Sequence, residues 1–467
     1  MMKNCIKFAS IMICCVGVSG LAAGDEMQAY AGVREWAQDS DQRMEWWREA
    51  RFGLFIHWGL YAAAGGYWPP DPAEGKLYPQ HYSEWIQNWA KVPPAEYARL
   101  ARPLFTAAKY DPSEWARLAK RAGMRYAVLT TKHHDGYTLF NSEAPYSLDN
   151  AISGGSNISP PGRDLVGEYA SAFRKAGLKV GFYYSLWDWQ HLDAPEHGPN
   201  TGGQREYGNY VDYLHQHVRE LMTNYGKIDI FWPDYSSDRF QGSFWRSREL
   251  LAKLREWQPE IIMNNRLWAG IENPNADFQT PEKYVPDTGL PGIDWEVCHT
   301  MNESFGFSFH DQKWKTVPET VRLLIDIASK GGNLLLNVGP AADGSLPEEA
   351  VGILEGVGDW MMIYGNAIHG TDAGPFPRLD WGRATRAGDR LYLFVYDWPS
   401  NGQLAVPLAN DPESARIMGG QELKWKAGEK GLLLSGLPER APNSIASVIE
   451  LELDGEPEVI ERLIDPD

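Results

Sequence analysis

Residues 227–238, KIDIFWPDYSSD, place a carboxylate between aromatic rings at the end of an apolar run. Asp234 lies between Trp232 and Tyr235. An ionised carboxylate in such surroundings costs free energy unless a partner compensates it or the group does chemistry. The ordinary alternative is an Asp that caps a helix or is solvated in a loop. A chemical role for Asp234 therefore depends on which other residues could join it.

Polar and aromatic residues also stand at the ends of other apolar runs. Together with Asp234 they are His57, Trp58, His133, His134, Tyr184, Trp187, Arg266 and Asn337. If these runs are parallel strands of one sheet, their carboxyl ends meet on one face, where barrel enzymes place their sites. The pattern thus predicts one pocket that combines acid, base and aromatic groups.

Two carboxylates that flank a glycosidic bond suffice to hydrolyse it, one as nucleophile and the other as general acid and base. Asp234 is one candidate. The second should come from a later strand end or loop, where Glu282, Glu296 and Glu303 stand, and spacing does not choose among them. The 20 Trp and 22 Tyr residues fit a sugar site, because aromatic rings stack on sugars, although they also fill large cores.

Other kinds of catalysis find less support in the sequence. His133 and His134 could be metal ligands, but adjacent side chains of a regular strand point to opposite faces. The chain has no G-x-S-x-G nucleophile elbow, and Cys298 lacks the local signature of a catalytic cysteine. The Gly-rich phosphate turn of nucleotide-binding folds does not follow the first strand. We therefore expect neither a metal ion nor a cofactor.

The elements that position these residues alternate between short apolar runs and amphipathic stretches. Asp111 and Glu114 open one predicted helix, and Thr316 with Glu319 forms the capping box of another. Strands are expected within 51–59, 125–136, 179–189, 227–234, 260–268 and 333–340, and helices within 111–124, 165–178, 205–224, 244–258, 316–332 and 347–365. Repeated strand–helix units of this length predict a parallel sheet, and their number predicts a (β/α)8-like TIM barrel over residues 25–370.

The pattern changes after about residue 370. Short alternating runs separated by Gly, Pro and Asn predict a small antiparallel β-sandwich domain over residues 371–467. A chain of 467 residues exceeds the size at which one core usually stops growing, so a second, smaller domain is expected.

Residues 1–24 have the features of a secretory signal peptide. Lys3 and Lys7 precede an apolar run, and small residues near Gly24 suit cleavage. The run is short for a membrane anchor. We therefore expect export to the periplasm or the extracellular space without a membrane anchor. The net charge of −18 argues against a nucleic-acid partner, because phosphate binding needs a basic face.

Seven motifs then occur in a fixed order, namely FGLFIHWG, TKHHDGYTLF, GFYYS, IDIFWPD, DFQTPE, WEVCHTMNESFGF and KGGNLLLNVGP. In this order and at roughly these separations they resemble the α-L-fucosidases of glycoside hydrolase family twenty-nine. The resemblance covers about residues 30–370 and does not rest on any single motif. The β-rich tail is compatible with the C-terminal sandwich of that family.

The resemblance implies a retaining double displacement on terminal α-L-fucose. Asp234 matches the family's nucleophile, and Glu282 in TPE is similar to the acid/base of many members. Trp and Tyr can cover the methyl face of fucose, while His and Arg can bind its hydroxyl groups. The expected partners are fucosylated oligosaccharides or polysaccharides. The residues implied to contact fucose are His57, Glu84, Trp85, His133, His134, Tyr184, Trp232 and Arg266.

One position departs from the pattern that the resemblance implies. Many family members have Gly directly after the nucleophile, whereas this chain has Tyr235, with Pro233 before Asp234. The departure concerns the leaving-group side of the pocket. Two other functions fit the sequence, namely hydrolysis of another fucose-like sugar such as α-L-galactose, and sugar binding without catalysis. The presence of Asp234 and a nearby acid argues against the second.

Overall fold

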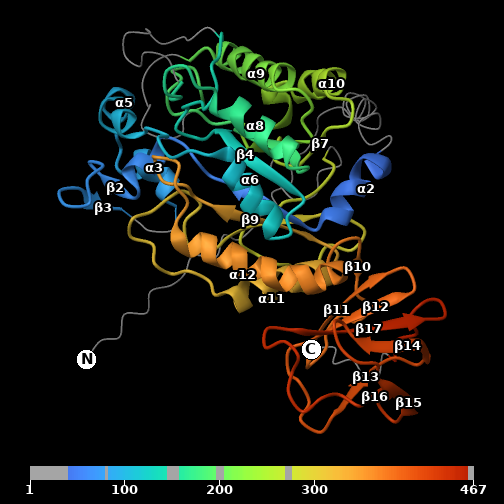
Figure 1. Cartoon of the computed structure of the whole chain (residues 1–467). Helices are drawn as coiled ribbons and strands as arrows, with labels where there is room; N and C mark the ends of the chain where they lie inside the picture. Colours follow the sequence, from blue (N-terminus) through green and yellow to red (C-terminus); the bar gives the residue numbers. More distant parts are fainter. Residues whose placement is uncertain (1–39, 79–81, 145–156, 196–204, 269–275, 461–467) are drawn as a thin grey trace, which may run out of the picture.

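The computed structural model describes residues 40–78, 82–144, 157–195, 205–268 and 276–460. The predicted signal peptide, residues 1–24, lies outside the described residues. Figure 1 shows a sheet surrounded by helices and, below it, a second unit built of strands. The first unit carries the residues that the sequence marks for chemistry.

The central sheet of the described chain has seven parallel strands in the order β7-β6-β5-β4-β1-β9-β8. Most of these strands are continuous buried runs, as expected for a parallel sheet covered on both faces. Their bounds are β1 Phe52–Ile56, β4 Tyr126–Lys132, β5 Lys179–Ser185, β6 Ile230–Asp234, β7 Ile262–Met263, β8 Glu296–Thr300 and β9 Asn333–Val338.

Residues 278–282 lie between β7 and β8, the two outer strands of this sheet. Isolated parallel bridges join this segment to both neighbours, pairing Asn264 with Phe278, Gln279 with Trp295, and Glu282 with Cys298. The segment thus acts as an irregular eighth strand, which we call the closing segment. The sheet closes through it into the (β/α)8-like barrel that the sequence predicts.

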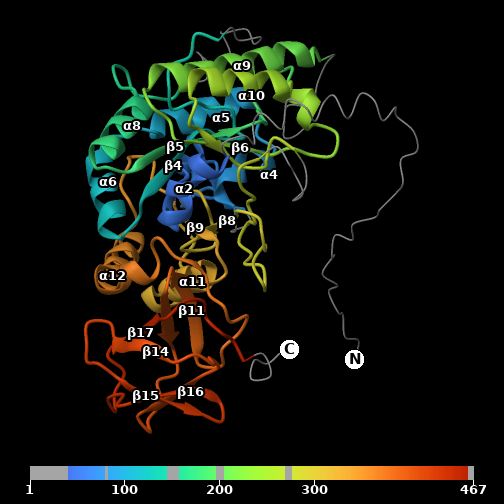
Figure 2. The same cartoon turned by 90° about the vertical axis from the view of Figure 1, so that its right-hand side faces the viewer.

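Helices cover the outside of the barrel, as Figures 1 and 2 show. Asp111 caps α6 by accepting hydrogen bonds from the amides of Ser113 and Glu114, and Thr316 with Glu319 forms the capping box of α11, so both predicted helix starts are confirmed. The covering helices are α6 Pro112–Arg121, α8 Leu165–Lys175, α9 Tyr207–Asn224, α10 Ser247–Trp257, α11 Val317–Ser329 and α12 Glu348–Tyr364.

The barrel interior is filled by alternate side chains of the strands. Phe55, Val128, Tyr183 and Trp232 belong to one buried cluster inside the barrel, while their strand neighbours pack against the helices. Helix α2, Ser40–Ala50, contributes Met44 and Trp47 to the interior cluster. Because Trp47 accepts a hydrogen bond from Asn333 at the start of β9, α2 covers the end of the barrel opposite to the strand carboxyl ends.

A long excursion follows β1 before the chain enters β4. It is built of short elements that lie at the carboxyl-end rim of the barrel and place residues 82–89 there. The elements are α3 Tyr61–Ala64, β2 Tyr67–Trp68, β3 Lys76–Leu77, η1 Ser83–Trp85, α4 Ile86–Trp89, α5 Pro94–Ala101 and η2 Arg102–Leu104.

Antiparallel strands form the C-terminal unit, as predicted from the sequence. One sheet has the order β10-β11-β12-β17-β14 and the other β13-β16-β15, around a largely aliphatic core. The unit packs on α11 and α12, where Asp326 pairs with Arg383 at 2.7 Å. The strands are β10 Asp372–Ala373, β11 Gly382–Ala387, β12 Arg390–Val395, β13 Gln403–Val406, β14 Pro412–Ile417, β15 Lys424–Gly428, β16 Gly431–Ser435 and β17 Ser447–Leu453.

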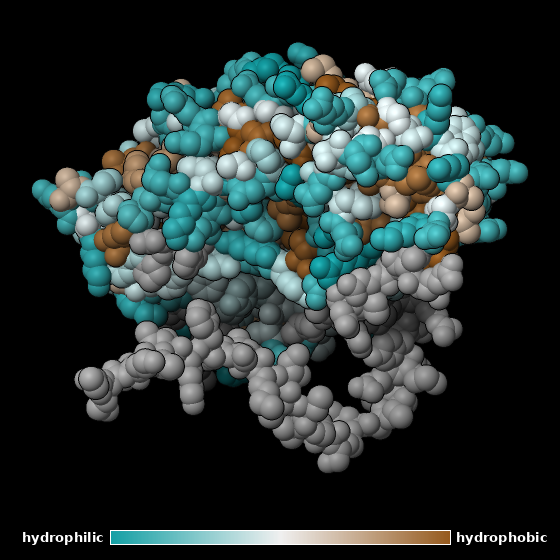
Figure 3. Space-filling model, turned by 90° about the horizontal axis from the view of Figure 1, so that it is seen from below, coloured by the Kyte–Doolittle hydropathy of each residue, from teal (hydrophilic) through white to brown (hydrophobic). Residues whose placement is uncertain are grey.

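The surface seen from below is mostly hydrophilic, and its hydrophobic side chains gather in small groups (Figure 3). This agrees with the net charge of −18. Within the residues that the structure describes, no helix combines the length and the apolar character needed to cross a membrane.

Candidate active site

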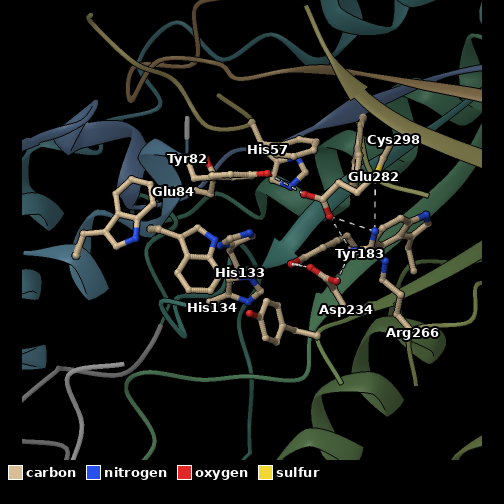
Figure 4. A pocket seen from close by; sticks show the side chains of 16 residues that line it. His57, Tyr82, Glu84, His133, His134, Tyr183, Asp234, Arg266, Glu282 and Cys298 are labelled. Atoms are coloured by element: carbon tan, nitrogen blue, oxygen red, sulfur yellow. Dashed lines mark hydrogen bonds and ion pairs between the residues drawn. The ribbon is translucent and has the colours of Figure 1, made fainter. Parts of the chain in front are cut away.

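A pocket of about 360 Å³ opens at the carboxyl ends of the barrel strands. Nine of the ten site residues expected from the sequence line it, from His57 after β1 to Glu282 on the closing segment. Figure 4 shows the acidic and basic side chains pointing toward one another across the pocket. The lining residues are Phe55, His57, Tyr82, Glu84, Trp85, Trp89, His133, His134, Tyr183, Trp232, Asp234, Tyr235, Arg266, Glu282, Cys298 and Phe305.

Asp234 is the last residue of β6 and is 7% exposed. Its Oδ1 accepts a hydrogen bond from Nη1 of Arg266 at 2.7 Å, and its Oδ2 accepts one from the Tyr183 hydroxyl group at 2.7 Å. Burial alone would raise the pKa of Asp234, but the charge of Arg266 and the hydrogen bonds outweigh burial and lower this pKa below its ordinary value. Asp234 is therefore ionised at neutral pH.

Glu282 reaches the pocket from the closing segment. Its Oε2 accepts hydrogen bonds from Nη1 and Nη2 of Arg266, each at 3.2 Å, and its Oε1 accepts one from the Tyr82 hydroxyl group at 3.4 Å. The side chain is 35% exposed. The guanidinium of Arg266 lies over the Trp232 ring, 4.6 Å from its centroid. It contacts the carboxylates of both Asp234 and Glu282 (Figure 4).

Glu296, the second acid that the sequence left open, lies beneath the pocket rather than in it. This first residue of β8 is 0% exposed. Its carboxyl group accepts hydrogen bonds from the Tyr126 hydroxyl group at 2.5 Å and from Nε1 of Trp232 at 3.0 Å. Burial raises the pKa of Glu296 to about 7. Its contacts position the ring of Trp232, which itself lines the pocket.

Glu303, the third open acid, also lies outside the pocket lining. Its carboxyl group forms an ion pair with Nζ of Lys313 at 3.0 Å. The structure thus brings only Glu282, of the three acids, into the pocket with Asp234.

His57 follows β1 and is oriented by Asn337 of β9. Nδ2 of Asn337 donates to the carbonyl oxygen of Phe305 at 2.7 Å, so Oδ1 of Asn337 accepts from Nδ1–H of His57 at 2.6 Å. Burial lowers the pKa of His57 to about 3, which leaves the ring neutral at pH 7. Nε2 of His57 is then a hydrogen-bond acceptor.

The expectation that His133 and His134 point to opposite faces is wrong. Strand β4 ends at Lys132, so the alternation of a regular strand no longer applies, and both rings line the pocket with centroids 4.1 Å apart. Burial lowers the pKa of both rings, that of His134 to about 4. Across the described residues, no group of three or more His, Cys, Asp or Glu side chains could hold a metal ion.

His134 is oriented in the same way as His57. The Ser185 hydroxyl group donates to the carbonyl oxygen of Trp187 at 2.9 Å and accepts from Nδ1–H of His134 at 2.7 Å. Nε2 of His134 is therefore an acceptor as well. Two neutral imidazoles thus offer fixed acceptors for hydroxyl groups.

Glu84 and Trp85 come from η1, on the excursion after β1. Glu84 is 2% exposed and accepts a hydrogen bond from the amide of Gly306 at 2.8 Å. Burial raises the pKa of Glu84 to about 7, so its charge depends on pH near neutrality. Trp85 is half-buried and meets the His134 ring edge to face at 5.2 Å.

Tyr184 is the expected site residue that the structure does not place in the pocket. Its hydroxyl group pairs with Nδ1 of His217 on α9 at 3.0 Å, and Nζ of Lys132 lies 4.7 Å from its ring centroid. Neighbouring strand residues point to opposite faces, and Tyr183 is the one that points into the barrel and contacts Asp234. The placement of Tyr184 in the pocket is therefore corrected to Tyr183.

Several lining residues were not assigned from the sequence. Tyr183 and Phe305 stand in GFYYS and NESFGF, motifs recognised without a role for these two rings. Tyr82 directly follows residues outside the described range, and its ring stacks on that of Phe305 at 6.1 Å. A signal existed only for Tyr183, since one of two adjacent strand tyrosines had to face the barrel interior. The unassigned residues are Phe55, Tyr82, Trp89, Tyr183, Cys298 and Phe305.

A parallel barrel whose carboxyl-end pocket holds a pair of carboxylates joined through one arginine, neutral histidines and several aromatic rings has the features of a glycoside hydrolase. Comparisons with known proteins narrow this class. Residues 22–366 match the family model described as Alpha-L-fucosidase. The chain belongs to the α-L-fucosidase family, glycoside hydrolase family GH29.

Relatives match over most of their length. The chain is 31% identical over 430 residues to the tissue α-L-fucosidase of Homo sapiens, and the match covers 87% of this chain and 88% of that one. It is 35% identical to the solved α-L-fucosidase isoenzyme 1 of Paenibacillus thiaminolyticus, with a TM-score of 0.79 over 89% of this chain and 99% of that one. A GH29 α-L-fucosidase of Bacteroides thetaiotaomicron, solved as a trapped covalent intermediate, is 28% identical with a TM-score of 0.77, over 89% of this chain and 97% of that one.

Proposed function

We propose that this protein is a retaining exo-α-L-fucosidase that removes terminal α-L-fucose from glycans or fucose-containing polysaccharides. In this proposal Asp234 is the nucleophile and Glu282 is the general acid and base. Membership of the α-L-fucosidase family supports the activity. The geometry of the two carboxylates supports the mechanism.

The observation that carries the proposal is that one nitrogen of Arg266 contacts both carboxylates. Nη1 lies 2.7 Å from Oδ1 of Asp234 and 3.2 Å from Oε2 of Glu282. The two oxygens are thus at most about 5.9 Å apart, near the ~5–5.5 Å of retaining glycosidases and below the ~6.5–9.5 Å of inverting ones. The relative from Bacteroides thetaiotaomicron, whose covalent intermediate was trapped with 2-fluoro-fucosyl fluoride, offers support from the same family.

The proposed reaction has two displacements at C1 of fucose. In the first, the Asp234 carboxylate attacks C1, the bond from C1 to the leaving oxygen breaks, and Glu282 gives its proton to that oxygen. In the second, Glu282 takes a proton from water, the water oxygen attacks C1, and the bond to Asp234 breaks. Arg266 and Tyr183 keep Asp234 ionised and oriented before the first attack, and they stabilise the carboxylate again as it leaves in the second displacement.

The other pocket residues fit a small deoxysugar. Nε2 of His57 and Nε2 of His134 are acceptors for two ring hydroxyl groups, and Glu84 accepts from or donates to another, depending on its protonation. Trp232 offers an apolar face for the C6 methyl group, with Phe305 nearby.

The decisive experiment follows the stereochemistry of the reaction. With an aryl α-L-fucoside, NMR should detect α-L-fucose as the first product, and β-L-fucose as first product would contradict double displacement. An aryl α-L-galactoside measured in parallel tests the alternative sugar, because a faster rate on it would replace fucose as the substrate. A protein that hydrolyses neither would be a binding protein.

Azide then separates the roles of the two acids. In Asp234→Gly, azide should replace the nucleophile and yield β-L-fucosyl azide. In Glu282→Ala, azide should replace water in the second displacement and yield α-L-fucosyl azide. Each variant is the matched control for the other, because the two should yield opposite anomers of fucosyl azide. If both variants yielded the same anomer, the assignment of the two catalytic roles would be refuted.

We also propose that the protein acts after export, because residues 1–24 carry the features of a signal peptide. Expression with and without these residues in a host with a periplasm tests the idea. Activity should move to the periplasmic or extracellular fraction only with the full chain. Equal distribution of both forms would contradict export.

A further inference from the structure

Tyr235, the residue directly after the proposed nucleophile, has a backbone conformation that is unfavourable for a residue with a side chain. Its φ is 77°, in the left-handed region that glycine adopts readily and other residues rarely do. A tyrosine persists there only if its surroundings hold it. Strained residues of this kind cluster at ligand-binding sites, so the contacts of the Tyr235 ring need an explanation.

The Tyr235 ring is part of an aromatic group at the pocket. Its centroid lies 3.6 Å from that of Trp187, 5.6 Å from that of Trp85 and 5.0 Å from that of the His134 ring. Tyr235 and Trp85 line the pocket and are half-buried, whereas Trp187 is 5% exposed and does not line it. Trp187 thus backs Tyr235, while Tyr235 and Trp85 keep ring surface toward the pocket.

Trp187 is itself fixed by buried polar contacts. Its carbonyl oxygen accepts hydrogen bonds from Nζ of Lys132 at 2.8 Å and from the Ser185 hydroxyl group at 2.9 Å. Nζ of Lys132 pairs with Asp188 at 3.3 Å, and both of these side chains are fully buried. A surface held in this way is preorganised, so a sugar that stacks on it loses little free energy to rearrangement of the protein.

The position of Tyr235 indicates that its ring contacts the leaving group rather than fucose. Tyr235 directly follows Asp234 in the chain and lines the same pocket as Glu282, and burial together with the negative charges of these two acids raises the pKa of Tyr235. The fucose hydroxyl groups are already matched by the buried histidines. The leaving group must depart on the side of Glu282, which donates its proton, and this acid stands at the exposed part of the pocket.

We propose that Tyr235, backed by Trp187 and flanked by Trp85, is the stacking surface for the sugar to which fucose is attached. It would select a pyranose with an apolar C–H face, such as galactose, joined directly to fucose. This inference rests on the proposed fucosidase function. Stacking of this kind contributes most binding free energy for ring-shaped leaving groups and none for a leaving group of a single atom.

The experiment compares two substrates that differ only in the leaving group. α-L-Fucosyl fluoride has a single-atom leaving group, whereas a fucosyl-galactose disaccharide of the linkage that the wild type cleaves fastest places galactose on Tyr235. The ratio of kcat/KM for the disaccharide to kcat/KM for the fluoride should fall at least tenfold in Tyr235→Gly, and Tyr235→Phe should keep it within about threefold. The ratio does not depend on the folded fraction of a variant, because both substrates meet the same active molecules.

The outcomes separate the two proposals. A ratio that stays within threefold in Tyr235→Gly would overturn the stacking surface alone, and so would a wild type that hydrolyses the fluoride but no fucosyl-galactose. A tenfold fall in Tyr235→Phe as well would assign the effect to the hydroxyl group and overturn stacking. A wild type that leaves α-L-fucosyl fluoride intact would overturn the fucosidase function, and this inference with it.

Discussion

The inner end of the pocket and its mouth are built from different parts of the barrel. At the inner end, Asp234, His57 and Glu84 are 7%, 4% and 2% exposed, and each is held by a hydrogen bond from or to a neighbouring element. At the mouth, Glu282 stands on the irregular closing segment with its side chain 35% exposed, and Tyr235 is half-buried in a left-handed backbone.

This difference assigns different tasks to the two regions. Burial and fixed partners set the charge of the inner residues, so that Asp234 is ionised and His57 is neutral. The inner end is therefore a preorganised site that suits one sugar. The mouth residues Glu282 and Tyr235 lie on irregular segments at the strand ends, where they face the part of the substrate that leaves. Inner changes should therefore affect every substrate alike, and mouth changes should depend on the leaving group.

The largest expected effect is at the inner end. Asp234→Asn keeps the shape of the side chain but removes the proposed nucleophile, and kcat/KM should fall at least about 10⁴-fold on all fucosides. The measurement is kcat/KM on α-L-fucosyl fluoride, an aryl fucoside and a disaccharide. The control is Asp238→Asn, the same change on an exposed residue of the following loop, which should leave all three rates within twofold. A loss in Asp234→Asn that varied tenfold among the substrates would contradict the division of tasks.

A smaller and substrate-dependent loss is expected at the mouth. Glu282→Ala should lower kcat/KM by about 10²–10⁴-fold on the disaccharide, whose leaving oxygen needs a proton, and far less on activated aryl fucosides. Glu303→Ala is the matched control, because Glu303 pairs with Lys313 outside the pocket. Equal losses of Glu282→Ala on both substrates would indicate that Glu282 does not donate the proton.

The fold was predictable because its signals are periodic and local. Apolar runs that end in polar groups placed His57 and Asp234 at one face, and the capping residues Asp111 and Thr316 marked two helix starts that the structure bears out. The sequence did not indicate the closing segment, because residues 278–282 make isolated bridges and have no strand pattern. Glu282 could therefore be chosen over Glu296 and Glu303 only from the family resemblance.

The sequence could not predict the direction in which side chains at the strand ends point. Tyr183 and Tyr184 are identical and adjacent, and only the register of β5 in the closed barrel decides which one faces inward. The direction of His133 and His134 depended on where β4 ends, a boundary that differs by single residues from what an apolar run suggests. Both errors arise from tertiary geometry at strand ends.

Substitution of the two tyrosines of β5 by phenylalanine gives a matched pair of variants, whose expected effects are smaller than those of the Asp234 and Glu282 variants. Tyr183→Phe removes the hydrogen bond to the Asp234 carboxylate, worth about 1.5–3 kcal/mol, so kcat/KM should fall roughly tenfold or more on all fucosides. Tyr184→Phe removes the buried contact with His217, so it should lower the melting temperature and leave kcat/KM within twofold. The same kinetic effect in both variants would contradict the inward direction of Tyr183.

The smallest expected effect is on stability and concerns Glu84 at the inner end. Its pKa is about 7 in the folded protein, because of burial, against an ordinary 4.5. Between these two values the folded protein binds a proton that the unfolded chain has released, so the free energy of unfolding falls as the pH rises through this window. The fall due to Glu84 is at most about 3 kcal/mol.

Glu84→Gln removes this titration while keeping an oxygen that can accept from the Gly306 amide. The melting temperature of the variant, relative to that of the wild type, should therefore rise from pH 5 to pH 8. At pH 5 the wild-type carboxyl group is already protonated, so the two proteins should differ little there, and this pH serves as the internal control. If the difference in melting temperature between variant and wild type stayed constant from pH 5 to pH 8, Glu84 would be solvated like a residue of the mouth. The contrast between the two ends of the pocket would then not extend to this side chain.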